Sequence, residues 1–183
     1  MTVVAFYGGS FNPPHVAHVL ACAYLLSATE VERVLVVPVY RHAFDKPLAP
    51  FEHRVEMCRR AVGWLPGVEV SDVESGLATP SLTLRTLEHL AGQHPDWSLR
   101  LVIGSDVLFE ARKWHAFDQI CQLAPPLVLG RVGFPHPEAP VAVLPEVSST
   151  RIRELAAEGA HRELGYLLPR SVLEYVEQHE LYR

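Results

Sequence analysis

The sequence of 183 residues contains few cysteines, no long hydrophobic run and no excess of basic residues. Its three cysteines, Cys22, Cys58 and Cys121, are far apart and form no C-x-x-C pair, which argues against a disulfide framework or a zinc ribbon. No apolar run approaches the ~20 residues of a membrane span, and the N-terminus lacks the basic segment of a signal peptide. We therefore expect a cytoplasmic protein with buried free thiols and no membrane partner.

The charge balance is mildly acidic, with 16 Lys and Arg against 21 Asp and Glu and a net charge of -5. Binding of nucleic acid needs a basic face, and this total does not favour one, so no nucleic-acid partner is expected. About half of the chain is apolar (49%), which is typical of a folded core. Any positive charge that contacts an anionic ligand must then be local.

Short β-branched runs alternate with longer segments of helical periodicity. Strands are expected at 3–7, 33–38, 68–73, 99–103, 126–129 and 141–144, and helices after Pro14 and at 50–62, 81–93, 150–158 and 171–178. This alternation predicts an α/β fold, a Rossmann-like doubly wound parallel sheet in a single domain. We expect that domain to span residues 1–183, with the C-terminal helical segment from about 149 packing on it. Ligands bind such sheets beyond the carboxyl ends of the strands.

The first candidate site is the segment GGSFNPPHVAH at 8–18, which follows the first expected strand. Two glycines let a ligand approach main-chain N–H groups, and two prolines stiffen the entry to a helix. The N-terminus of a helix carries unpaired N–H donors that bind phosphate. His15 and His18 share one face of its first turn and can donate to phosphate oxygens. The alternatives are a tight turn with two solvated histidines, or a metal site that lacks a third ligand.

The second candidate site is VSSTRIR at 147–153, directly after the expected strand at 141–144. Ser148 or Ser149 can cap the following helix, and capping alone would explain the pattern. However, the start of this helix is expected at the same sheet edge as the two histidines. Two helix ends that face one cleft suit a polyphosphate, and Arg153 would supply the local positive charge.

The two segments together resemble known signatures. GGSFNPPHVAH resembles the G-x-F-x-P-x-H-x-G-H motif of the HxGH nucleotidyltransferase superfamily, and VSSTRIR is similar to its I-S-S-T-x-I-R signature. The resemblance covers essentially the whole chain and is closest to the branch of bacterial nicotinate mononucleotide adenylyltransferases. One departure is Ala17, which stands where the family usually has glycine.

The resemblance implies an ATP site built from both segments. His18 would stabilise charge at the α-phosphate, and His15 would support the phosphates; these two are the expected catalytic residues. The remaining expected ATP contacts are Gly9, Ser10 and Phe11 after the first strand, Gly104 and Asp106 after the fourth, and Ser149, Thr150 and Arg153 of the second signature.

The resemblance also implies an acceptor site. Thr83 lies in a stretch similar to the family's S-Y-T-x-x-T, with Leu82 replacing the usual tyrosine. Trp114 would stack on a pyridine ring, and the backbone near His115 would contact the carboxylate. Lys46 could reach a phosphate from the loop at 41–49, which departs from the family pattern. For Asp106, Thr83 and Trp114 the alternatives are a helix cap, a helix-start threonine and a core tryptophan.

The implied reaction joins ATP and nicotinate mononucleotide to give deamido-NAD and pyrophosphate, as in NAD biosynthesis. Mg²⁺ is expected to bind mainly through ATP phosphates, with no metal site made by the protein. Two alternatives use the same fold with nicotinamide mononucleotide or phosphopantetheine as acceptor. A third is a non-catalytic nucleotide-binding sensor. The sequence leaves open whether the chain forms a homo-oligomer, and it assigns no role to the Pro-rich 134–140 segment.

Overall fold

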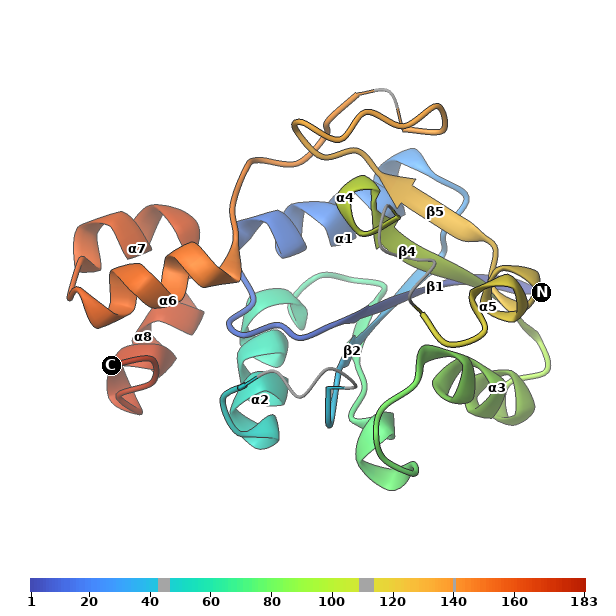
Figure 1. The fold of residues 1–183 in the computed structure, drawn as a ribbon, viewed down its shortest axis with the longest axis horizontal. Coiled ribbons are helices and arrows are strands. Elements are labelled where there is room, and N and C mark those ends of the chain that lie inside the picture. The colour runs from blue at the N-terminus through green and yellow to red at the C-terminus, as the bar shows by residue number, and fades with distance from the viewer. Residues whose placement is uncertain (43–46, 109–113, 140) are drawn as a thin grey trace.

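The computed structural model describes residues 1–42, 47–108, 114–139 and 141–183. A five-stranded sheet forms the centre of the molecule, and every neighbouring pair of strands is parallel. The strands are β1 (Thr2–Gly9), β2 (Arg33–Pro38), β3 (Val68–Val70), β4 (Trp97–Gly104) and β5 (Pro126–Leu129), in the order β3-β2-β1-β4-β5. The chain reverses its direction of travel across the sheet between β1 and β4, as in a doubly wound fold (Figure 1). The predicted fold class is confirmed.

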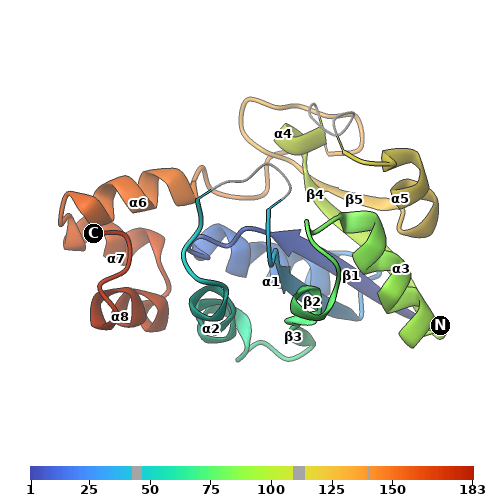
Figure 2. The same cartoon turned by 60° about the horizontal axis from the view of Figure 1, so that its bottom comes forward.

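Helices cover both faces of the sheet (Figure 2). The successive residues Val4, Ala5 and Phe6 of β1 are all buried, but on alternate faces. Val4 and Phe6 pack with α3 (Thr83–Gln93) and α5 (Phe117–Leu123), while Ala5 packs with α1 (Val16–Ala28) and α2 (Phe51–Val62). Burial on both faces explains why the strands read as nearly continuous apolar runs.

Three C-terminal helices, α6 (Ser149–Ala157), α7 (His161–Leu167) and α8 (Arg170–Gln178), share the hydrophobic cluster of α1 and α2. Ile152 of α6 and Val172 of α8 are fully buried in this cluster. In Figure 1 the three helices form the end of the molecule farthest from α3 and α5. The strands run toward this end, so the three helices lie beside the carboxyl ends of the strands (Figure 1). Ligands bind at this edge in such folds.

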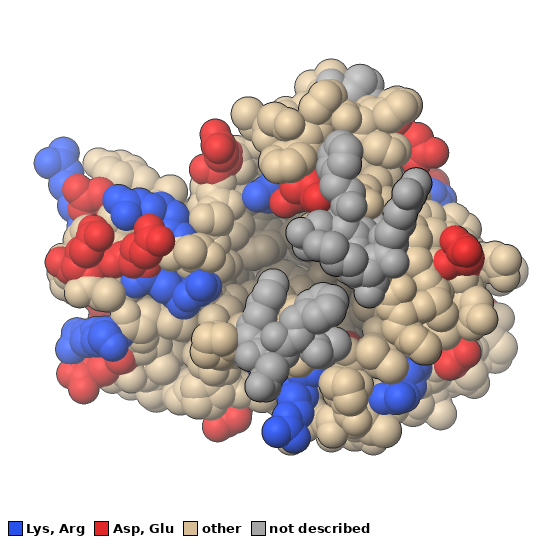
Figure 3. All heavy atoms as spheres, viewed as in Figure 1, with Lys and Arg blue, Asp and Glu red and all other residues tan. Residues whose placement is uncertain are grey.

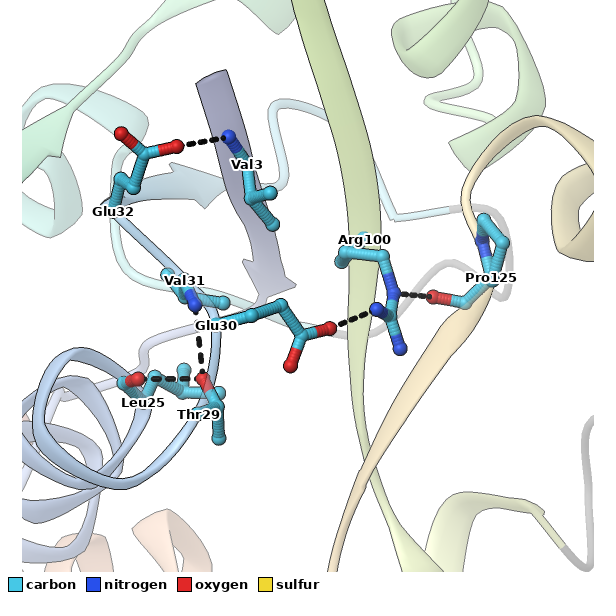
Figure 4. Close-up of polar contacts among 8 residues, drawn as sticks. All are labelled: Val3, Leu25, Thr29, Glu30, Val31, Glu32, Arg100 and Pro125. Atoms are coloured by element: carbon cyan, nitrogen blue, oxygen red, sulfur yellow. Dashed lines mark hydrogen bonds and ion pairs between the residues drawn. The ribbon is translucent and has the colours of Figure 1, made fainter. Parts of the chain in front are cut away.

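Polar contacts fasten the opposite edge of the sheet, where the strands begin (Figure 4). Glu32 accepts a hydrogen bond from the backbone N–H of Val3 at 3.0 Å. Arg100 of β4 forms an ion pair with Glu30 and donates to the carbonyl of Pro125 at 3.0 Å. These contacts join the α1–β2 connection to β1 and β4, and join β4 to the start of β5. The polar groups at this edge are therefore bonded to one another.

The structure lacks one expected strand and contains four short elements that were not expected. Residues 141–144 do not form a strand, because prolines on both sides remove backbone donors and leave Val141 and Val143 exposed. The short elements η1 (Val73–Gly76), α4 (Ser105–Leu108), α5 and α7 were not expected. Each has seven residues or fewer, too short for a clear helical period. Among the described residues, no helix is long and apolar enough to cross a membrane.

Candidate active site

The connection from β1 to α1 is a tight, strained turn. Phe11 adopts a left-handed backbone with φ of 45°, which is uncommon for a residue other than glycine. Its buried ring lies edge-on to Tyr7 and His18, with centroids 5.5 and 4.9 Å apart. Pro14 leads into His15, which is the N-cap of α1. The strained turn therefore places a helix N-terminus and its histidines directly after β1.

His15 and His18 form a stacked pair at this helix end. Their ring centroids are 3.8 Å apart with an interplanar angle of 29°. The backbone N–H of His15 donates to Nδ1 of His18 at 3.0 Å. A neutral His18 must then carry its proton on Nε2, which makes Nε2 a donor. The buried Nδ1 of His15 has no hydrogen-bond partner among the described residues.

Both histidines are held neutral. Burial, and after it the nearby Arg131 guanidinium, lowers the pKa of His15 from 6.5 to about 4. Burial first, then His15 and Arg131, lowers the pKa of His18 well below its ordinary value. The pair therefore offers uncharged hydrogen-bond donors at physiological pH, and any positive charge must come from neighbouring arginines.

The N-terminus of α6 lies against the same turn. Ser148 caps α6 by accepting from the N–H of Arg151, while Ser149 donates to the carbonyl of Pro13 at 2.9 Å. Arg153 donates to the carbonyl of Asn12 at 2.9 Å and to Thr150 at 3.2 Å. The structure thus brings the two predicted helix ends together, and joins Ser149 and Arg153 to the turn that carries the histidines.

Gly104 at the end of β4 and Asp106 just after it lie at the same edge. A Cβ at position 104 would overlap Oδ1 of Asp106, so glycine is needed for the carboxylate to fold back over the strand end. Arg131 follows β5, and its Nε lies 3.9 Å from Oδ2 of Asp106. The backbone N–H of Arg131 donates to the hydroxyl oxygen of Ser105 at 2.9 Å. Figure 3 shows a hollow on this face, between the C-terminal helices and the sheet, with charged atoms of both signs at its rim.

A cavity of about 290 Å³ extends from the turn toward α3 and α5. Gly9 and Ser10 line one side, and Thr83, Trp114 and His115 line it together with apolar side chains of β1, β2 and β4. The Trp114 ring meets Phe117 edge-on at 6.0 Å. The structure therefore brings the three described acceptor candidates into one pocket. The fourth, Lys46, lies outside the described residues.

Glu74 is a carboxylate in the wall of this cavity and is almost fully buried. It accepts from the hydroxyl of Thr86 at 3.0 Å and from the N–H of Tyr40 at 2.9 Å. Thr86 and Tyr40 thereby satisfy one oxygen each, and the two bonds fix the loop after β2 against α3. Hydrogen bonding of this kind offsets the cost of burying a charge.

Two arginines of the site were missed at the sequence level. Arg54 is 1% exposed and donates to the carbonyls of Ala49, Ser10 and Val39, which ties the turns after β1 and β2 to α2. It falls on the apolar stripe of α2 with Cys58 and Ala61, at spacings of four and seven residues. Arg131 could have been identified as a site residue from its position, because it directly follows the carboxyl end of a predicted strand.

The fold and the paired helix ends define a nucleotidyltransferase site, and comparison with known proteins agrees. The family model described as cytidylyltransferase-like matches residues 6–155, and the chain belongs to this family. A probable nicotinate-nucleotide adenylyltransferase of Anaeromyxobacter sp. (strain K) is 48% identical over 98% of this chain and 96% of its own length. The corresponding protein of Myxococcus xanthus is 39% identical, over 98% and 94%.

The fold is also similar to that of a solved structure. Nicotinic acid mononucleotide adenylyltransferase of Plasmodium falciparum, solved in complex with NaAD, superposes with a TM-score of 0.85 at 19% identity, covering 100% of this chain and 98% of that one. The predicted resemblance and the enzyme class, nucleotidyltransferase, are confirmed.

Proposed function

We propose that this protein transfers the adenylyl group of ATP to nicotinate mononucleotide, which gives deamido-NAD and pyrophosphate. One observation carries the proposal: Gly9 and Ser10 of the phosphate-binding turn also line the cavity that holds Thr83 and Trp114. A nucleotide on the turn and a pyridine ring in the cavity would therefore meet at one place. The names of the relatives and the NaAD in the Plasmodium structure support the same acceptor.

In the proposed step, a phosphate oxygen of the acceptor forms a bond to the α-phosphorus of ATP as the bond to the bridging oxygen breaks. Pyrophosphate leaves with the electron pair. The acceptor phosphate has a second pKa of about 6 and is already anionic at neutral pH, so no general base is required. The protein's contribution is positioning and electrostatic stabilisation.

His18 is the proposed donor to the α-phosphate, because its Nε2 must carry the proton. His15, whose ring stacks on that of His18, would support the phosphates beside it. The backbone of Gly9, Ser10 and Phe11 would line the nucleotide, with Gly104 and Asp106 at its border. The leaving phosphates would be bound by Ser149, Thr150 and Arg153.

Arg131 joins this proposal as a counter-charge. It is close enough to lower the pKa of both histidines, and its ion pair with Asp106, at 3.9 Å, is long. A guanidinium in this position can bind an incoming phosphate more strongly than it binds the partly exposed carboxylate. Arg131 would thereby supply positive charge that the neutral histidines do not.

Mg²⁺ belongs to the proposal as a companion of ATP. Among the described residues, no group of three or more His, Cys, Asp or Glu side chains could hold a metal ion. The ion would be bound mainly by phosphates and water, with Asp106 as the carboxylate at this edge. When bound, Mg²⁺ would neutralise charge on the departing pyrophosphate.

The acceptor half of the proposal uses shape more than charge. Trp114 offers a flat face to the pyridine ring, while Thr83 and the backbone near His115 would bind its carboxylate. Lys46 stays a prediction for the acceptor phosphate. Three further expectations from the sequence are part of the proposal. The chain forms a single domain over 1–183, on which the helices from about 149 pack. The protein is cytoplasmic, and a homo-oligomer is one arrangement that the proposal leaves open.

The test is pyrophosphate release with ATP, Mg²⁺ and one of three acceptors: nicotinate mononucleotide, nicotinamide mononucleotide or phosphopantetheine. We expect strong preference for the first. Preference for either of the others would retain the phosphate site and overturn the acceptor assignment. ATP binding without product from any acceptor would favour a nucleotide sensor and overturn the enzymatic proposal.

A further inference from the structure

The C-terminal end of the chain reaches back to the phosphate-binding turn. The hydroxyl of Tyr182 donates to Oδ1 of Asn12 at 3.0 Å, across 170 positions of sequence. Tyr182 lies outside residues 6–155, the part of the chain that the family model matches. Its contact is therefore not part of either phosphate-binding signature, although it ends on a residue of the first.

Asn12 is a point where four parts of the chain meet. The side chain is 3% exposed, and its Oδ1 also accepts from the N–H of Ala49 at 3.0 Å. Its backbone carbonyl accepts from Arg153 of α6. The turn after β1, the approach to α2, the start of α6 and the C-terminus are thus bonded through one residue, three positions before His15.

The backbone of the C-terminal turn is strained in a way that serves this contact. Glu180 and Tyr182 have φ of 50° and 68°, in the left-handed region. Among the described residues, the other non-glycine positions with positive φ are Phe11, in the phosphate turn, and Ala116, beside His115 of the cavity. Strain of this kind persists where the surrounding structure imposes it, and it is concentrated at functional sites.

The environment of the hydroxyl agrees with a fixed donor. Burial raises the pKa of Tyr182, so the phenol stays protonated and can donate. Arg54 and Arg153 both lie close enough to oppose that shift, and each donates to a carbonyl of the phosphate turn. Side chains of α2, α6 and the C-terminus therefore converge on the side of the turn that bears its carbonyls.

From this geometry we propose that Tyr182 is a positioning residue for the nucleotide, acting through Asn12. Its hydroxyl helps to hold the turn so that the carbonyls of Asn12 and Pro13 bond to α6, while the histidines of α1 stay in their stacked pair. A displacement of about 1 Å in groups that position a substrate can lower the rate ~10²-fold. The proposal rests on the proposed function for its kinetic readout, and on ATP binding for an independent one.

The test compares Tyr182→Phe, which removes one oxygen atom, with Tyr166→Phe, the same change on an exposed side chain of α7. Loss of one neutral hydrogen bond predicts a roughly fivefold fall in kcat/KM for ATP in Tyr182→Phe. The KM for the acceptor should stay within about twofold. Tyr166→Phe should match wild type. A merely structural role would lower the melting temperature of Tyr182→Phe, but it would not lower kcat/KM for ATP while leaving the KM for the acceptor unchanged.

A double-mutant cycle with Asn12→Ala identifies the route of the effect. If Tyr182 acts through Asn12, adding Tyr182→Phe to Asn12→Ala should change kcat/KM for ATP no further. Effects that multiply, or a Tyr182→Phe protein indistinguishable from Tyr166→Phe, would overturn the inference. Should Asn12→Ala fail to fold, the comparison of the two tyrosine variants decides alone.

Titration of ATP binding separates this inference from the enzymatic one. If wild-type protein makes no dinucleotide but Tyr182→Phe still binds ATP more weakly than Tyr166→Phe, the proposed function fails and the positioning role stands. If wild-type protein is active and the two variants bind and turn over ATP equally, the function stands and the positioning role fails.

Discussion

The two halves of the candidate site are built by different means. In the nucleotide half, hydrogen bonds from Ser149, Arg153 and Arg54 fix the backbone of one turn, and two neutral histidines stack at its end. In the acceptor half, apolar side chains enclose a cavity of about 290 Å³. Directional bonds demand particular residues, whereas a cavity demands a shape that several residues can provide. Changes in the first half should therefore act on kcat, and changes in the second on KM.

The largest expected effect tests the first half directly. His18→Ala removes the proposed donor to the α-phosphate, and loss of one such donor typically lowers kcat by ~10²–10³. ATP affinity should change much less, because the donor acts mainly as charge develops. His89→Ala, on an exposed position of α3, is the matched control in single-turnover and binding measurements. An unchanged kcat would show that His18 is only a packing partner of Phe11.

Acid stability tests how deeply the nucleotide half is buried. Below pH 6.5 an unfolded His15 binds a proton, while the folded residue does so only near its pKa of about 4. The unfolded state then binds more protons, so stability falls as the pH falls through this window. A group whose pKa differs between the two states changes the free energy of unfolding by ~1.4 kcal/mol per pH unit. His15 should therefore lower the free energy of unfolding by about 2 kcal/mol between pH 6.5 and pH 5.

Urea unfolding of wild type and His15→Asn over this range measures that cost. The variant should be less sensitive to acid by about the same 2 kcal/mol. Parallel pH profiles for the two proteins would mean that His15 gains a proton in the folded state. In that case the pair would be a charged phosphate site, and the contrast between the neutral histidines and Arg131 would disappear.

Within the nucleotide half, sequence predicted some features and missed others. Five of the six expected strands and the two signatures were predictable, because β-branched runs, paired glycines and N-cap residues act locally. Arg54 and Arg131 were not identified, since one contacts carbonyls that lie far away in sequence and the other acts through the order of strands in the sheet. The bonding of Ser149 and Arg153 to the turn likewise depends on tertiary packing, as does the contact of Tyr182 with Asn12.

Trp114→Ala tests the acceptor half. Removing a ring that stacks on the substrate should raise the KM for nicotinate mononucleotide about tenfold, at 0.5–1.5 kcal/mol for the aromatic pair plus lost contact area. The kcat and the KM for ATP should change little. Trp64→Ala, at an exposed tryptophan after α2, is the matched control. A fall in kcat with an unchanged acceptor KM would indicate that Trp114 supports α5 and not the substrate.

Gly104→Ala has the smallest expected effect and tests where the two halves meet. The added methyl would displace the end of the Asp106 side chain, a flexible group, so stability should change by less than ~1 kcal/mol. The displacement also separates Asp106 from Arg131, and we expect kcat/KM for ATP to fall about fivefold, since one charged contact at the nucleotide edge is altered. Gly92→Ala, in α3 with open space where the added Cβ would stand, is the matched control. If Gly104→Ala instead raised only the acceptor KM, Asp106 would belong to the cavity, and the boundary between the two halves would lie on the other side of β4.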